Sequence, residues 1–234
     1  RSPRESAMTV TLGFVGCGRM GQMAHIANYA EIARQGHVRL KAVTDLKRSQ
    51  AEAVASRYGI EKVYDSVDDI CADDEIDGVV CIMFWALQVE PAIRLLEAGK
   101  HVIVEKPLAG SAAAGQRMVD AADAAGRHLV CGYMKCHDSG LQWARERVGE
   151  RGATPHQAHL FFAGGDWWAN LGEPITTDEP MPEGWGTQNW MPPGLSETQA
   201  RAFTFFINIY SHHLGMLRYL LGRELELISI EPHG

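Results

Sequence analysis

The sequence predicts an α/β fold built around a doubly wound parallel sheet, followed by a shorter mixed region. Between Val10 and Gly132, short β-branched runs alternate with longer helical stretches, as in repeated βαβ units. Hydrophobic residues are 46% and charged residues 22% of the chain, an ordinary globular composition. A length of 234 residues allows one large domain or two modest ones. Together these observations exclude a coiled coil, a collagen-like repeat and long disorder.

Six strands and their connecting helices are expected in a first domain that spans residues 8–131. The predicted strands are Val10–Val15, Val38–Thr44, Val63–Tyr64, Gly78–Ile82, Val102–Val104 and His128–Cys131. The predicted connections are helices Gln22–Arg34, Ser49–Tyr58, Val89–Ala98 and Ser111–Ala125, and a short turn after Asp68. Several helices stop at a glycine, the residue that best tolerates the left-handed position after a helix. These glycines are Gly36, Gly59, Gly99 and Gly126.

The remaining residues, 132–234, are expected to form a second, mixed domain. Its predicted parts are a helix near Ser139–Val148, a strand His156–Phe162, an irregular loop Gly164–Gly194, a helix Glu197–Leu221 and a strand Leu225–Ile230. Two strands with an exposed face are marginal on their own. We therefore expect this second domain to be truncated or to be completed by a partner subunit.

The net charge and the cysteines indicate which partners and which cellular compartment to expect. The net charge of −7 repels phosphate backbones and anionic lipids, which argues against nucleic acid and membrane partners. The five cysteines form no C-x-x-C pair and suit a reducing cytoplasm. The stretch Arg1–Ala7 is polar and lacks the apolar core of a signal peptide, and the sequence has no apolar run of membrane-spanning length. A cytoplasmic location is the expectation.

A glycine-rich turn follows the first predicted strand and opens the first helix. Its residues are Gly16, Cys17, Gly18, Arg19, Met20 and Gly21. Glycines permit a tight turn and close approach of the backbone to a pyrophosphate, and the helix N-terminus supplies amide donors. Asp45 ends the second strand, at the spacing of an acid that accepts hydrogen bonds from the adenosine ribose. The sequence therefore predicts a dinucleotide-binding site.

The residues around Asp45 favour NAD over NADP. A carboxylate at this position repels the 2′-phosphate of NADP. Lys47 and Arg48 follow it and leave an alternative open, because a basic pair could accept that phosphate. The same pair could equally be the solvated start of a helix.

The fifth strand leads into the turn Glu105–Pro107, at the sheet edge where open α/β folds bind ligands. A lysine here, Lys106, can donate hydrogen bonds to a substrate oxygen as charge develops on it. Taken alone, a lysine at a strand end is more often a surface charge.

Four stretches carry a resemblance to a known family, the Gfo/Idh/MocA oxidoreductases, named for glucose-fructose oxidoreductase and inositol dehydrogenase. They are Gly13–Gly21, Glu97–Ala109, Gly132–Lys135 and Ser211–Gly222. The first two are specific as a pair. The resemblance covers most of residues 8–147 and 200–230, and it fails across the tryptophan-rich loop.

The resemblance implies an N-terminal Rossmann domain, a C-terminal domain with an open sheet, and NAD(P)-dependent oxidation or reduction at a carbon of a sugar, cyclitol or related polyol. It implies that Lys106 contacts the reacting oxygen and that His212, on the late helix, gives or takes the proton. Relatives often form homo-oligomers through the open sheet, so a homo-oligomer is expected. Other candidate residues for the cofactor are Trp85, Gln88 and Glu105, and for the substrate Tyr133, Lys135, Asp166 and Trp167.

The sequence departs from the family pattern at three places. Asn208 stands four residues before His212, where the family often has an aspartate, and it carries no charge to stabilise an imidazolium. Gly215 replaces a second frequent aspartate. The turn Met83–Gln88 replaces a Thr-Pro-Asn segment, and its Trp85 could stack on the nicotinamide or pack in the core.

Histidines elsewhere give little support for a metal site. His212 and His213 are adjacent, hence about 100° apart on a helix, and only one can point into a given site. His212 shares a face with Asn208, so His213 is expected to be peripheral. His156 and His159 would face opposite sides of a strand, and no cluster of cysteines or carboxylates completes a shell. No metal is predicted.

Aromatic residues gather in the irregular loop, where a carboxylate accompanies them. They are Trp167, Trp168, Trp185 and Trp190, beside Asp166. Aromatic faces next to a carboxylate suit a sugar ring, and long loops often act as lids. Packing of the loop or a subunit contact is the alternative.

Two other functions stay open. Some relatives keep NAD bound and use transient oxidation to cleave a glycosidic bond. The substitutions at Asn208 and Gly215 are also compatible with a non-catalytic regulatory protein that binds a dinucleotide or a sugar.

Overall fold

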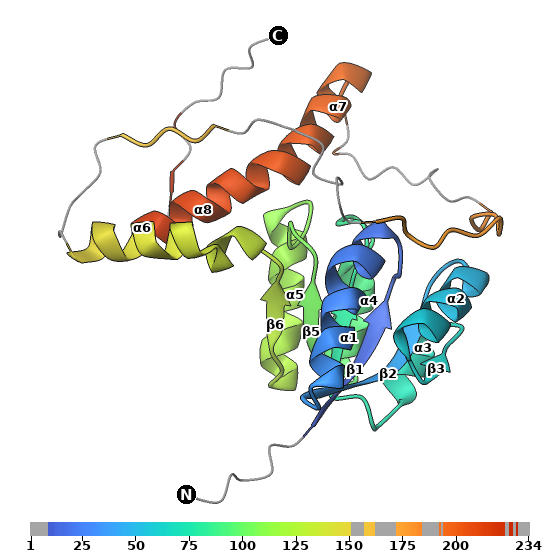
Figure 1. Cartoon of the computed structure of the whole chain (residues 1–234). Coiled ribbons are helices and arrows are strands. Elements are labelled where there is room, and N and C mark those ends of the chain that lie inside the picture. The colour runs from blue at the N-terminus through green and yellow to red at the C-terminus, as the bar shows by residue number, and fades with distance from the viewer. Residues whose placement is uncertain are drawn as a thin grey trace, which may run out of the picture. The chain divides into compact units, whose positions relative to one another are not determined.

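The computed structural model describes residues 9–150, 157–161, 172–183, 192, 194–222, 225–226 and 228 (Figure 1). The chain divides into two compact units. Among the described residues, the first unit holds 9–132 and 172–183, and the second holds the rest. The boundary at Gly132 lies one residue from the expected one. The segment 172–183, which the sequence assigned to the second domain, belongs to the first unit.

The first unit is a parallel sheet of six strands in the order β3-β2-β1-β4-β5-β6 (Figure 1). The strands are β1 Val10–Val15, β2 Val38–Thr44, β3 Lys62–Val63, β4 Gly78–Cys81, β5 His101–Val104 and β6 Leu129–Cys131. All five neighbouring pairs are parallel. The chain order reverses between β1 and β4, and this reversal is the switch point at which such sheets bind ligands. The predicted doubly wound sheet is confirmed.

Helices connect the strands, and residues at the ends of several helices explain where these helices begin or end. They are the π-helical turn η1 Gly21–Ile26, α1 Ala27–Arg34, α2 Arg48–Tyr58, α3 Val67–Ala72, α4 Val89–Glu97 and α5 Ala112–Ala125. The four glycines expected after helices all have positive φ, between 61° and 79°. The stretch predicted as a short turn after Asp68 is instead the helix α3, because Ser66 and Asp69 cap its start reciprocally.

Both faces of the sheet carry a hydrophobic core, as expected for parallel strands. On β1, Phe14 belongs to the cluster under α1 and α2, whereas the next residue, Val15, belongs to the cluster under α4 and α5. On β4, Val80 and Val79 divide in the same way. The alternation of side chains along each strand thus fixes the sheet between two helical layers.

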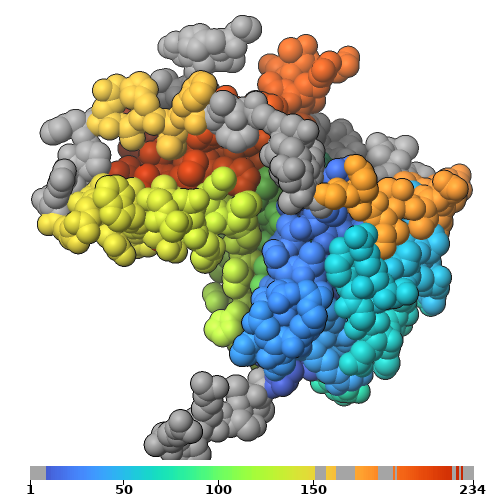
Figure 2. Space-filling view, viewed as in Figure 1, coloured from blue at the N-terminus to red at the C-terminus, as the bar shows by residue number. Residues whose placement is uncertain are grey.

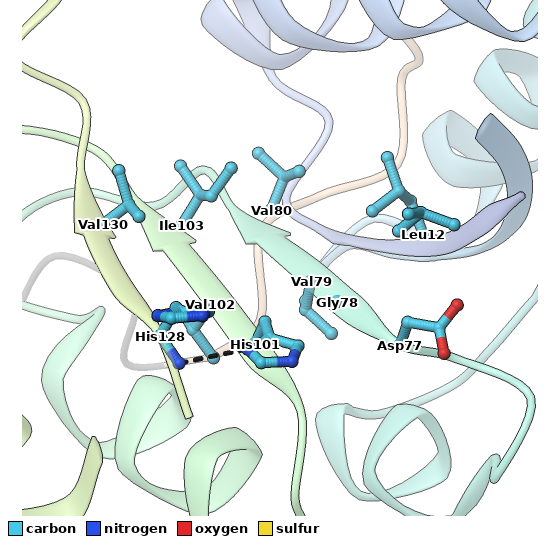
Figure 3. Close-up of a pocket in the computed structure, with 11 residues that line it drawn as sticks. Leu12, Asp77, Gly78, Val79, Val80, His101, Val102, Ile103, His128 and Val130 are labelled. Carbon is cyan, nitrogen blue, oxygen red and sulfur yellow. Dashed lines mark hydrogen bonds between the residues drawn. The ribbon is translucent and has the colours of Figure 1, made fainter. Parts of the chain in front are cut away.

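A hollow lies on the α1 side of the sheet, across β1, β4, β5 and β6. Figure 3 shows Leu12, Val80, Ile103 and Val130 pointing to this one face. The remaining lining residues include Asp77, His101 and His128, which stand at the starts of the strands. The hollow therefore lies toward the amino ends of the strands, away from the edge that carries the glycine-rich turn.

In the described residues of the second unit, the regular secondary structure is helical. Its elements are the 3₁₀ turn η2 Met134–His137, α6 Ser139–Glu150, α7 Glu197–Phe205, the π-helical turn η3 Phe206–Tyr210 and α8 Ser211–Leu221. The predicted helix Glu197–Leu221 is thus present as one run with a π-helical turn in it. Helix α6 packs against α8, with the guanidinium of Arg145 4.4 Å from the ring centre of Tyr219.

The two strands predicted for this region are not formed by its described residues. Residues 157–161 of the first, and 225, 226 and 228 of the second, have no strand pairing, so this prediction is wrong for them. Phe161 and Ile228 are 91% and 92% exposed. A strand requires hydrogen-bonded neighbours and a buried face, and an isolated pair of strands gains too little from either.

Candidate active site

The glycine-rich turn connects β1 to η1 at the carboxyl edge of the sheet. Gly16 has φ of 87°, and a Cβ there would lie 2.3 Å from the backbone oxygen of Ile82. A Cβ on Gly21 would lie 3.0 Å from the oxygen of Gly16. By contrast, a Cβ on Gly18 would meet no described atom within 4 Å, and Gly18 is exposed. The turn is therefore closed toward the protein and open outward, as the cradle of a pyrophosphate must be, so these residues fit a dinucleotide.

Asp45 holds this turn in place from the end of β2. One carboxylate oxygen accepts a hydrogen bond from the N–H of Cys17 at 2.7 Å, and the other accepts one from the N–H of Lys47 at 3.0 Å. Burial, together with the charge of Asp45, raises the pKa of the Cys17 thiol, so this buried side chain is not a nucleophile. Any contribution of Cys17 to ligand binding comes from its backbone.

Lys47 and Arg48, the two basic residues that could accept a 2′-phosphate, are bonded to other groups. The ammonium of Lys47 donates to the backbone oxygen of Thr177 at 3.5 Å. The guanidinium of Arg48 pairs with Glu52, on the next turn of α2, at 2.9 Å and also with Asp65. The alternative of a basic phosphate site at this turn thus has no support from these contacts.

A segment far along the chain, residues 172–183, lies against η1 and the start of α2 (Figure 2, light orange). Gln22, which is 1% exposed, binds both backbone groups of Ile175: its amide nitrogen donates to the oxygen at 3.0 Å, and its oxygen accepts from the N–H at 2.7 Å. The same nitrogen donates to the oxygen of Cys17 at 2.9 Å. Sequence reasoning missed Gln22 and Ile175, because a contact across 153 residues leaves no local signal.

The second half of the site is the turn after β5. Glu105 accepts a hydrogen bond from the imidazole of His25 at 2.7 Å, and its other oxygen accepts from the N–H of Lys106 at 3.0 Å. Burial raises the pKa of Glu105, but the bonds from His25 and Lys106 outweigh burial and hold this pKa below its usual value. His25 stands on η1, so the pair joins the glycine-rich turn to the Glu-Lys-Pro turn.

Lys106 is half-buried, and burial lowers the pKa of its ammonium, against the charge of Glu105. The peptide bond between Lys106 and Pro107 is cis. The fully buried Gln88 holds the turn from behind, because its amide nitrogen donates to the backbone oxygens of Glu105 and Pro107, each at 2.7 Å. Gln88 therefore shapes this turn, and a direct contact with a cofactor stays a prediction.

Trp85 lies in the turn after β4 and is 4% exposed. A Cβ on Gly110 would lie 2.3 Å from a carbon of its indole ring, so the ring fills the space that this glycine leaves. Phe84 packs beside it, with ring centres 5.0 Å apart. This geometry matches the core-packing alternative, and stacking on a nicotinamide stays a prediction.

The remaining candidates belong to the second unit. His212 stands at the start of α8 and is half-buried, and Asn208 is exposed on η3. His213 is 7% exposed, with its ring centre 5.3 Å from that of Tyr210. The ring of His213 is thus buried beside an aromatic side chain, and its expected place outside the active site stays a prediction.

The substitution Gly215 has a packing reason within the second unit. A Cβ there would lie 3.0 Å from the ring of Tyr133, so the glycine admits this ring against α8. Tyr133 thus has a structural role beside its predicted contact with substrate. Lys135 is exposed on η2. The aromatic loop candidates Asp166, Trp167, Trp168, Trp185 and Trp190, and also His156, lie outside the described residues.

The described residues contain no group of three or more histidine, cysteine or carboxylate side chains that could hold a metal ion. They also contain no helix that is long and apolar enough to cross a bilayer.

Comparison with known proteins identifies relatives of the chain. Inositol 2-dehydrogenases of Saccharopolyspora erythraea and Paracoccus denitrificans are 33% and 30% identical to this chain, over 65% of its residues. The chain covers only 44% and 45% of those proteins, or about half their length. Myo-inositol dehydrogenase of Lactobacillus casei, solved with NAD(H) and myo-inositol, matches with a TM-score of 0.57 and 28% identity, over 61% of this chain and 42% of that one.

A probable dehydrogenase from Thermotoga maritima matches the fold over 93% of this chain and 56% of its own, with a TM-score of 0.64 and 19% identity. The sequence model of the Gfo/Idh/MocA proteins, described as an oxidoreductase family with an NAD-binding Rossmann fold, matches residues 10–133. That match spans more than half of the chain and includes both the glycine-rich turn and the Glu-Lys-Pro turn. The chain therefore belongs to the Gfo/Idh/MocA family of oxidoreductases, which has an NAD-binding Rossmann fold.

Proposed function

We propose that this protein is an NAD-dependent dehydrogenase that acts on a CH–OH group of a cyclitol or a related sugar. One observation carries the proposal: the pair between His25 and Glu105, at 2.7 Å, ties the cradle for the cofactor to the turn that bears Lys106. A dehydrogenase needs these two parts side by side, because the reacting carbon must lie against the nicotinamide. The names of the relatives indicate an inositol-like ring as the substrate class.

Each half of the site has a distinct task in this proposal. The backbone amides between Gly16 and Gly21 hold the pyrophosphate, and Asp45 accepts hydrogen bonds from the adenosine ribose. NAD, when bound, supplies the hydride acceptor. Lys106 donates a hydrogen bond to the substrate oxygen and stabilises the negative charge that develops there. Its lowered pKa suits this task, since the donated proton is then held less tightly.

The proton of the substrate hydroxyl goes to His212, the role that the family pattern assigns to this position. Asn208 replaces the usual aspartate four residues earlier, so the imidazolium formed at His212 is stabilised by an amide dipole instead of a full charge. The proposal therefore includes a weaker base at His212 than an aspartate partner would give.

The test combines direct binding with turnover. Binding of NAD to the full chain is measured by titration calorimetry, and a panel of inositols, sugars and glycosides is then screened for NADH formation. Lys106→Ala should keep NAD binding and lose at least about a hundredfold in turnover. Lys62→Ala, which removes an exposed lysine at the far edge of the sheet, is the matched control and should change neither.

The other outcomes identify other functions. Release of an aglycone without net NADH would replace the proposal by a glycosidase that oxidises its substrate transiently. Binding of NAD without any turnover would point to the regulatory alternative. Unchanged turnover in Lys106→Ala would remove Lys106 from the mechanism.

A further inference from the structure

The start of α2 binds a carboxylate that belongs to the chain itself. Glu179, in the segment 172–183, accepts hydrogen bonds from the backbone N–H groups of Arg48 at 3.2 Å and Ser49 at 2.7 Å. The hydroxyl of Ser49 donates to the same carboxylate at 2.6 Å. Backbone amides at the first turn of a helix, aided by the helix dipole, bind anions, and here the anion is an internal side chain.

The position of this carboxylate relates it to the cofactor. Helix α2 begins at Arg48, three residues after Asp45, which ends the second strand and is the residue that accepts hydrogen bonds from the adenosine ribose in an NAD site. NADP differs from NAD by one phosphate on that ribose. The groups that could receive the phosphate are therefore those of the turn between β2 and α2, including the amides that Glu179 already uses.

The cations of the same turn are also engaged. Arg48 pairs with Glu52 and Asp65, and Lys47 donates to the backbone oxygen of Thr177, within the segment 172–183. A 2′-phosphate would have to displace these partners as well as the carboxylate of Glu179. The carboxylate of Glu179 thus places a second negative charge at this turn, besides that of Asp45, and both charges repel a phosphate.

We propose that Glu179 is a determinant of cofactor specificity, which excludes NADP by the negative charge that it places at the amide donors at the start of α2. The inference deepens the proposed function, since it rests on the cofactor site at the glycine-rich turn. It assigns to the segment 172–183 a role in selecting the cofactor by its charge.

The segment is held in position independently of Glu179. Gln22 bonds both backbone groups of Ile175, and the side chain of Ile175 packs against the core cluster under α1 and α2. The hydrogen bonds from Ser49 also lower the pKa of Glu179, so the carboxylate stays charged through the neutral range. A substitution that removes only the charge should therefore leave the segment in place.

The experiment measures binding of the adenosine half alone. Calorimetric titration with 2′,5′-ADP, ADP, NADP and NAD is carried out on the wild-type chain, on Glu179→Gln and on Glu173→Gln. Glutamine keeps the shape and an acceptor oxygen but removes the charge. Glu173 is an exposed glutamate of the same segment, so its variant controls for a general change of charge.

In Glu179→Gln, the affinity for 2′,5′-ADP and NADP should rise about tenfold, and the affinity for ADP and NAD should stay within about twofold. The gain should shrink as salt is raised, because it arises from a charge near the surface. Glu173→Gln should behave like the wild type.

An unchanged ratio of NADP to NAD affinity in Glu179→Gln would overturn the inference and leave the proposed function intact. A wild-type chain that binds none of the four ligands would overturn both. Equal gains in both glutamine variants would attribute the effect to net charge and would also contradict a specific role of Glu179.

Discussion

Replacement of Gly16 by alanine tests the cradle of the cofactor most directly. The residue has φ of 87°, and the added Cβ would lie 2.3 Å from the oxygen of Ile82. A left-handed alanine costs about 1 kcal/mol, and ordinary contact requires a separation of about 3.4 Å, so the backbone must move by roughly 1 Å. Together these terms predict a loss of about 2–3 kcal/mol in the free energy of unfolding.

Urea unfolding followed by circular dichroism provides the measurement. With a slope of about 2–3 kcal/mol per molar, the midpoint for Gly16→Ala should fall by about 1 M, and NAD binding should be lost. The matched control is Gly18→Ala, whose Cβ meets no described atom within 4 Å. Its unfolding midpoint should stay within about 0.2 M of the wild type, while NAD binding weakens because the methyl group projects from the open side of the turn. A Gly16→Ala variant as stable as the wild type would refute the steric reasoning.

Three further predictions concern charges and hydrogen bonds of the first unit. Lys106→Met should lose turnover, but its urea midpoint at pH 7 should not fall below that of the wild type. The reason is that burial lowers the pKa of Lys106 and disfavours its charged form. A clear drop of the midpoint would contradict this prediction. The lowered pKa of Glu105 stabilises the fold above the ordinary range of a glutamate, and this contribution is lost as pH falls through the folded pKa. Glu105→Gln should therefore be less stable than the wild type at pH 7, and the difference should shrink as the pH falls through and below the ordinary pKa of a glutamate, about 4.3, as unfolding at a series of pH values would show. Gln22→Ala should speed amide exchange at Ile175, since the N–H of Ile175 loses its acceptor; unchanged protection would mean that other contacts hold the segment 172–183.

Local patterns were sufficient to predict the sheet of the first unit. All six strands lie in the predicted apolar runs, and their bounds differ from the prediction by one residue at most. The helix α3 was missed because its start depends on the reciprocal bonds of Ser66 and Asp69, a pattern with aspartate where glutamate is usual. The π-helical turn η1 lies largely within the predicted helix Gln22–Arg34, and the local pattern does not distinguish it from the α-helix that follows.

The site divides in the same way. The glycine-rich turn, Asp45 and Lys106 could be predicted because their residue types and spacing follow from the ligand chemistry. Gln22 and Glu179 could not, because each acts through groups more than 120 residues away in the chain, at Ile175 and at Ser49. The predicted strand His156–Phe162 had the right composition, but its described residues have no neighbouring strand to pair with.

The bonds between Gln22 and Ile175 also bear on where the first unit could be cut from the chain. The match to the family ends at residue 133, yet a fragment of the chain that ended there would lack Ile175 and Glu179. The amide of Gln22, 1% exposed in the intact chain, would lose two of its partners, and the start of α2 would lose its anion. The compact first unit is therefore discontinuous in sequence, and a fusion or recombination at residue 133 would separate two segments that are hydrogen-bonded to each other.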